Sequence, residues 1–190
     1  NNDLIDLYAV GHEAVTRGDD EVPFKHTLKI NGPKGEIVRV SALFDGAAMV
    51  AAMCWSIFKQ VKHRLGTWRE SKKRLQMANG DIVPSKAVWK GRMTLGKVEV
   101  EGEFEVFDSK GGWAFLLGKP LLHLFRAQQD FSTDTVTIAD RQGGNITILY
   151  NEIRQSKLSD NIIGVNLTLD VKQVATYMGG SEAKPPPRAV

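Results

Sequence analysis

Residues 98–106 alternate strictly between apolar and acidic side chains, and this pattern constrains the fold more than any other part of the chain. In an extended chain the two kinds of side chain point to opposite sides: Val98, Val100, Phe104 and Val106 to one, and Glu99, Glu101, Glu103 and Glu105 to the other. Such alternation predicts an antiparallel strand with one buried face and one face in water.

Other segments favour the same class of structure. A turn sequence, Asn31-Gly-Pro-Lys-Gly35, separates strand-like runs at 25–30 and 36–44 and predicts a hairpin. Further strands are expected at 135–138, 146–150 and 162–171. Helical spacing of apolar residues predicts a helix over 50–65, ended by Gly66, and Pro120 begins a short second helix. We therefore expect a mostly β protein with little helix.

Composition narrows the class of protein. The chain has 190 residues, of which 42% are hydrophobic and 25% charged, as in soluble globular domains. Its longest apolar stretch, at 47–55, falls far short of the roughly 20 residues that span a bilayer, so we expect no membrane partner. The chain lacks a secretory signal and an initiator Met, and it has one cysteine. We expect a piece of a longer protein in a reducing, intracellular and cytoplasmic setting.

Charge is distributed unevenly along the chain. Residues 1–22 carry six acidic residues and one basic residue, whereas residues 59–74 carry seven basic residues and one acidic residue. The basic segment could bind phosphate, and a nucleic-acid-binding β-barrel is one alternative. A solvated helix face with its loop is the simpler interpretation, so we do not expect nucleic acid as a partner.

The predicted organisation has four parts. An acidic N-terminal arm covers 1–23, a core domain 24–140, a C-terminal β extension 141–180, and a Pro-rich linker 181–190.

No pattern in the sequence indicates a metal or cofactor. The four histidines are isolated and no cysteine pair is present, so we expect neither a metal nor a cofactor. A nucleophilic pair of Cys54 and His63 is conceivable, but nine residues along one helix place them on opposed faces. Cys54 is better explained as a small core residue.

One carboxylate has an unusual setting. Asp45 ends the apolar run 40–44 and is followed at once by the small residues Gly46, Ala47 and Ala48. Burial of an ionisable group is costly unless the group is hydrogen-bonded or used in chemistry. The alternative interpretation is that Asp45 caps a helix that follows directly.

Two further motifs follow in order. Ala78, Asn79 and Gly80 form a turn suited to a hairpin tip, and an apolar run ending in Leu117-Gly118 leads into the short helix. This ordered set resembles the retropepsin-like aspartic proteases, most closely the protease domains of fungal retrotransposon polyproteins, over residues 24–138. The fold that the resemblance implies is a retropepsin-like closed β-barrel with a flap hairpin and one or two short helices.

The resemblance also implies a mechanism. Asp45 matches the catalytic Asp of the family, Asn79-Gly80 the flap tip, and Leu116-Leu117-Gly118-Lys119 the second motif. Proteases of this type use two carboxylates that share one proton. Since this chain offers one Asp in such a turn, two chains would supply the pair as a homodimer that cleaves an extended peptide. The strands at 146–150 or 162–169 could join the two copies.

The turn departs from the family pattern. In one register, Gly46 replaces the usual Ser or Thr, and Ala47 replaces a Gly that can adopt positive φ cheaply. In the other register, Gly46-Ala47 matches the Gly-Ala of the family and the loop is one residue shorter. Either register predicts a weaker dimer. The alternative to an active endopeptidase that processes a retroelement polyprotein is therefore a catalytically impaired dimerisation or peptide-binding module.

Overall fold

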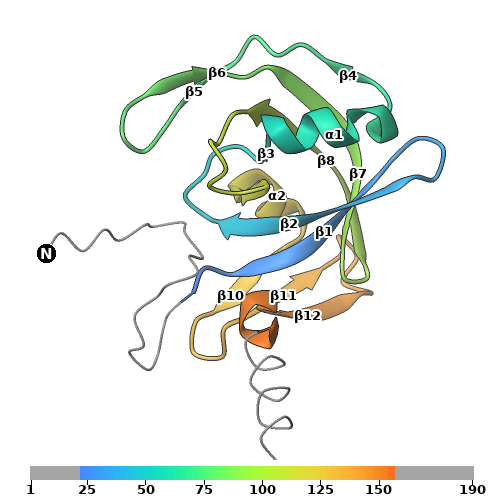
Figure 1. Cartoon of the computed structure of the whole chain (residues 1–190). Helices are drawn as coiled ribbons and strands as arrows, with labels where there is room; N and C mark the ends of the chain where they lie inside the picture. The colour runs from blue at the N-terminus through green and yellow to red at the C-terminus, as the bar shows by residue number, and fades with distance from the viewer. Residues whose placement is uncertain (1–21, 157–190) are drawn as a thin grey trace, which may run out of the picture. The chain divides into compact units, whose positions relative to one another are not determined.

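The structure is a computed structural model that describes residues 22–156, and these form mainly β-strands (Figure 1). The strands are β1 (Lys25–Asn31), β2 (Ile37–Asp45), β3 (Ala52–Cys54), β4 (Trp68–Arg69), β5 (Arg74–Gln76), β6 (Ile82–Pro84), β7 (Ala87–Leu95), β8 (Val98–Phe107), β9 (Phe115–Gly118), β10 (Gln128–Asp130), β11 (Thr135–Ala139) and β12 (Ile146–Tyr150). The helices are α1 (Trp55–Leu65) and α2 (Lys119–Leu124). Neither helix is long and apolar enough to cross a membrane.

The main sheet closes on itself. Its strands follow the order β1-β2-β9-β3-β8-β7-β4, and β7 pairs also with β1, through Lys29 opposite Thr94 and Ile30 opposite Met93. Two pairings in this barrel are parallel, β2 with β9 and β3 with β8. Because parallel strands end at the same edge, the segments that follow β2 and β9 emerge next to each other. The predicted fold class is confirmed: a mostly β closed barrel with a flap hairpin and short helices.

Aromatic side chains fill the centre of the barrel. Phe104 stacks on Trp89 with ring centroids 5.1 Å apart and meets Phe115 edge to face at 5.3 Å. All three side chains are buried, so they belong to the core. The Trp89 indole N–H donates to the Leu65 carbonyl at 2.8 Å and so fixes the end of α1 against the barrel.

A smaller antiparallel sheet, β10-β11-β12, packs against the same core. Its inward residues Val136, Ile138 and Leu149 are buried with the barrel residues. On the outer side of β12, an edge strand, Ile146, Ile148 and Tyr150 remain more than half exposed, at 67%, 54% and 55%.

Two expectations from the sequence are wrong in detail. Residues 52–54 form strand β3 between β8 and β9, so the helix begins at Trp55 and not near residue 50. Although residues 50–54 have apolar side chains at helical spacing, residues 52–54 form a strand because they pair with β8 and β9. On β8, Glu99, Glu101 and Glu103 are exposed as expected, but Glu105 is 2% exposed.

Some predictions lie outside the described residues: the acidic arm up to residue 21, the strand at 162–171, and the Pro-rich linker. The β extension predicted from residue 141 is described as far as residue 156, and its strand β12 pairs with β11.

Replacing Phe104 with Ala is expected to lower the free energy of unfolding by about 3–5 kcal/mol, because the change leaves a cavity among the packed aromatic rings. Phe131→Ala, at a side chain that is 83% exposed, serves as the control and is expected to change stability by less than about 0.5 kcal/mol. Urea denaturation of both variants measures the difference. Equal effects of the two substitutions would contradict this description of the core.

Candidate functional site

Asp45 is the last residue of β2, and its own backbone turn binds its carboxylate. Oδ1 accepts hydrogen bonds from the N–H groups of Ala47 at 2.9 Å and Ala48 at 3.2 Å. Within residues 22–156, no hydrogen bond reaches Oδ2. The side chain is half-buried, and strand β3 follows the turn, so Asp45 does not cap a helix. The carboxylate is thus held through one oxygen and presents the other.

The parallel partner strand supports this turn. Asp45 lies opposite Gly118 in the β2–β9 register, and the Lys119 N–H donates to the Ala48 carbonyl at 2.8 Å. A Cβ atom at Gly118 would collide with the carbonyl oxygens of Val50 and Ala48. Gly118 therefore allows the Asp45 loop, residues 45–50, to lie directly on the end of β9. The structure places the predicted turn and the second motif, Leu117 with Gly118, side by side.

The small residues of the turn carry little strain. Neither Gly46 nor Ala47 is among the residues with positive φ, so a side chain at these positions meets no backbone penalty. A Cβ at Gly46 would have no heavy atom within 4 Å. The expectation that Ala47 occupies a position suited to glycine is wrong for this turn.

The predicted flap is a hairpin made by β5 and β6, which projects from the barrel (Figure 1). Met77 donates to Asp81 at 2.7 Å and Gly80 to Met77 at 2.9 Å across the tip, and Gly80 has a φ of +89°. Ala78, Asn79 and Gly80 are exposed at this tip. The hairpin and its turn are therefore where the sequence indicated, while the functional role of the tip stays a prediction.

One apolar cluster joins the hairpin to the Asp45 loop. Its buried members come from β2, β3, β8 and β9, and its half-buried members come from the loop, the hairpin and the segment before β9: Leu43, Ala52, Phe107 and Leu116, with Ala48, Leu75, Met77 and Trp113. Leu75 and Met77 of the hairpin thus pack in the same cluster as Ala48, which lies three residues after Asp45. Leu75 lies within β5 and Met77 directly precedes the exposed tip, and these two side chains make the connection.

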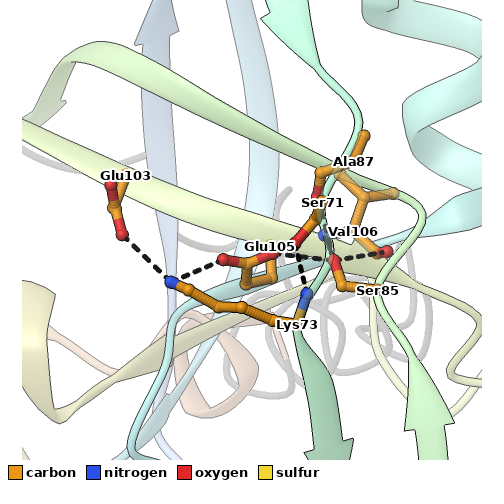
Figure 2. A network of polar contacts seen from close by, with 7 residues as sticks. All are labelled: Ser71, Lys73, Ser85, Ala87, Glu103, Glu105 and Val106. Atoms are coloured by element: carbon orange, nitrogen blue, oxygen red, sulfur yellow. Dashed lines mark hydrogen bonds and ion pairs between the residues drawn. The ribbon is translucent and has the colours of Figure 1, made fainter.

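A buried glutamate, Glu105, lies at the base of the hairpin, where the sequence pattern predicts an exposed side chain. Figure 2 shows Glu105 of β8 between Lys73, which precedes β5, and Ser85, which follows β6. The Lys73 ammonium lies 2.8 Å from Glu105 Oε1, and the Ser85 hydroxyl donates to Oε2 at 2.7 Å. Lys73 also lies 3.4 Å from the exposed Glu103. We call Ser71, Lys73, Ser85 and Glu105 the Glu105 cluster.

These contacts keep Glu105 ionised. Burial raises the pKa of its carboxyl, but hydrogen bonds from Lys73, Ser71 and Ser85 and the charge of Lys73 outweigh burial and hold the pKa below the usual 4.5. The hydrogen bond to Glu105 in turn raises the pKa of Lys73 above 10.5. The alternation along β8 predicts that the Glu105 side chain is exposed to solvent. Nothing in that pattern indicates that Lys73 and Ser85 contact it.

Cys54 and His63 are not brought together. Cys54 is 1% exposed at the start of α1, and His63 lies in the last turn of that helix. Burial raises the pKa of the Cys54 thiol, but hydrogen bonds with Ser109 and Ser56 lower it to about 7. Cys54 is a core residue, as predicted. Among residues 22–156, no three His, Cys, Asp or Glu side chains are grouped closely enough to hold a metal ion.

The basic segment 59–74 runs from α1 to the base of the hairpin. Lys59 lies over the Trp55 ring at 5.8 Å and Lys62 over the Trp68 ring at 5.6 Å. Lys73 belongs to the Glu105 cluster. Several positive charges of the basic segment therefore have partners within the chain. A role for this segment in binding nucleic acid stays an untested alternative.

Gly118→Ala is expected to displace the Asp45 loop and to lower the free energy of unfolding by about 1–3 kcal/mol, because the new methyl group overlaps backbone oxygens that cannot rotate away. Gly46→Ala is the matched control, with open space around the new methyl group and an expected change below about 0.5 kcal/mol. Chemical denaturation gives both values. If Gly118→Ala were as stable as Gly46→Ala, the result would contradict the close contact described between the loop and the end of β9.

No protein-family model and no curated protein sequence matches the chain. Among solved structures, the fold is similar to the retroviral protease-like domain of Ddi1 from Leishmania major. The TM-score is 0.46 and the sequence identity is 14%, over 70% of this chain and 97% of that chain. At this identity the similarity concerns the fold alone.

Proposed function

We propose that this chain is an aspartic endopeptidase of the retropepsin type, active as a homodimer with Asp45 supplied by each copy. The observation that carries the proposal is the Asp45 carboxylate itself. It is half-exposed at the end of a barrel strand, held by backbone N–H groups through Oδ1, and placed on Gly118 of the parallel strand. A rigid carboxylate with one oxygen presented is what general acid–base chemistry requires.

The chemistry follows from two such carboxylates. Like charges about 3 Å apart cannot both ionise, so a pair of Asp45 side chains would share one proton. The ionised member would take a proton from water, which attacks the peptide carbonyl. The protonated member would donate to the departing amine. Neither step needs a metal or a cofactor.

The exposed edge strand β12 is a candidate surface for contact with a second copy of the chain. The outer side of β12 presents Ile146, Ile148 and Tyr150, all more than half exposed, and this strand is the edge of its sheet. An edge strand offers unpaired backbone groups, and apolar side chains there favour burial against another chain. These features support the assignment of β12 to the dimer contact that the sequence resemblance implies.

The β5–β6 hairpin would close over the bound peptide. Flap-like elements exclude water and complete a site when substrate binds. An extended peptide in such a site gains backbone hydrogen bonds along its length. The order of the three motifs resembles that in fungal retrotransposon proteases, so we propose a retroelement polyprotein as the substrate.

Asp45→Asn is expected to reduce cleavage of a denatured polypeptide near pH 5 by at least about 100-fold, because the amide cannot accept the proton from water. Asp108→Asn, at another carboxylate that accepts a backbone N–H, is the control and keeps wild-type activity. Solution mass across a concentration series accompanies the assay and is expected to show a dimer for all three proteins. Cleavage that survives in Asp45→Asn and is blocked by metal chelators would overturn the proposal.

The second candidate function is a peptide-binding or dimerisation module without turnover. It is favoured by Gly46, which offers no hydroxyl to brace the loops of two copies across a dimer. This candidate predicts peptide binding but no cleavage between about pH 4 and 7.

The double variant Gly46→Thr, Ala47→Gly decides between the candidates. The open space at Gly46 and the absence of positive φ at Ala47 allow both changes without loss of fold. If the wild type is a module that has lost activity, the variant gains cleavage that Asp45→Asn removes again. A stable monomer without cleavage in either form would leave Asp45 without a partner and make the binding module the better description.

A further inference from the structure

The base of the flap hairpin is attached to the barrel through one buried side chain. Lys73 and Ser85 flank the hairpin in sequence, and the Ser85 N–H donates to the Lys73 carbonyl at 2.9 Å, so the two residues close its base. Both hold the Glu105 carboxylate, one on each oxygen. The Ser85 hydroxyl also lies 3.0 Å from the Ala87 carbonyl, at the start of β7. Figure 2 shows the Lys73 and Ser85 side chains meeting Glu105 from either side.

The backbone of the same residue supports the Asp45 loop. The Glu105 N–H donates to the Ala51 carbonyl at 2.9 Å, directly after the loop ends, and Glu105 lies opposite Ala52 of β3. One residue therefore bonds the residue that directly follows the loop through its backbone and the base of the hairpin through its side chain. These are the two segments that a substrate would contact from opposite sides.

We propose that Glu105 is a positioning residue that fixes the flap hairpin relative to the Asp45 loop. The Lys73–Glu105 pair and the Ser85 hydroxyl hold the base of the hairpin, while the exposed tip at Ala78–Gly80 remains free to move onto a bound peptide. The functional part of this inference rests on the proposed protease activity. The attachment itself is measured on the free protein.

The charge of Glu105 matters because its neighbours on the adjacent strands are apolar and the polar groups that reach it come from the chain flanking the hairpin. The cross-strand positions are Ala52 of β3 and Val88 of β7, and the charged groups at the carboxylate are Lys73 and, through it, Glu103. A buried charge-assisted contact of this kind is stronger than a neutral hydrogen bond. Glu105→Gln keeps the size of the side chain and an acceptor for Ser85, and it replaces the oxygen that faces Lys73 with an N–H donor, so the ion pair is lost.

Hydrogen exchange on the full 190-residue chain tests the attachment. In Glu105→Gln, the amides of Leu75, Met77 and Ser85 are expected to exchange at least about tenfold faster than in the wild type, while amides of β1 and β2 are unchanged. Glu103→Gln is the matched control: it is the same substitution on the same strand beside the same lysine, but its side chain is 49% exposed. It is expected to alter hairpin exchange by less than about twofold.

Two variants of the lysine separate charge from packing. Lys73→Met should reproduce the faster exchange, and Lys73→Arg should retain protection because it keeps the positive charge. Unchanged hairpin exchange in Glu105→Gln would overturn the proposal. Exchange that rises equally in β1 and β2 would also overturn it, because Glu105 would then support only the fold as a whole.

The pH dependence follows from the two shifted pKa values. Because the pKa of Glu105 is lowered, its contribution is complete above its ordinary value of 4.5 and is lost as pH falls through the lowered value. Because the pKa of Lys73 is raised, its contribution is complete below 10.5 and is lost only at higher pH. Protection factors of the wild-type hairpin should stay constant from about pH 5 to 10 and fall in more acidic solution. In Glu105→Gln they should be low throughout.

Kinetics with an extended peptide give a functional measurement that a purely structural role would not produce. Glu105→Gln is expected to raise KM at least about threefold with a smaller change in kcat, because a loosened hairpin must be ordered when substrate binds. The acidic and basic limits of the pH profile should remain those of the wild type. If the wild type does not cleave peptides, the exchange experiment still decides the role of Glu105, so failure of the proposed function and failure of this inference are distinct.

Discussion

The parallel pairing of β2 with β9 is the constraint on which the candidate site depends. It places Asp45 opposite Gly118 and brings the turn after one strand onto the end of the other. The absence of a side chain at Gly118 lets the carbonyl oxygens of Ala48 and Val50 approach closely. Without this contact, the carboxylate would sit on a loop free to adopt many conformations. With it, the turn binds Oδ1 and leaves a defined direction for Oδ2.

The hairpin is held in a defined place relative to the Asp45 loop. An isolated hairpin with strands of three residues is marginal in water and needs support from the body of the protein. Two kinds of contact supply that support. Leu75 and Met77 pack against the same buried apolar residues as Ala48, and the Glu105 cluster holds the base of the hairpin through charge and hydrogen bonds. The apolar contacts can adjust to small movements of the hairpin, whereas the hydrogen bonds and the ion pair of the Glu105 cluster require a defined geometry.

Much of this arrangement could be predicted from sequence, because local patterns determined it. Alternation on β8, the turn at Asn79-Gly80 and the apolar run before Gly118 each describe a structure that neighbouring residues impose. Two features could not be found in this way. Residues 52–54 join the barrel because a gap between β8 and β9 accepts them, and Glu105 is buried because Lys73 and Ser85 reach it. Both depend on contacts between segments distant in sequence, about which spacing along one segment carries no information.

The attachment at the base of the hairpin has a consequence for how this protein can vary. Lys73 and Ser85 define a boundary: the chain between them leaves the barrel and returns at almost the same place, closed by one backbone hydrogen bond. A change in the length of the tip therefore does not shift the register of β7 and β8. The exposed tip, residues 78–80, could differ in length or composition while Met77 keeps its packing and the barrel and the Asp45 loop stay the same. If the chain binds peptides as proposed, the hairpin is the part that can change to fit peptides of different shape.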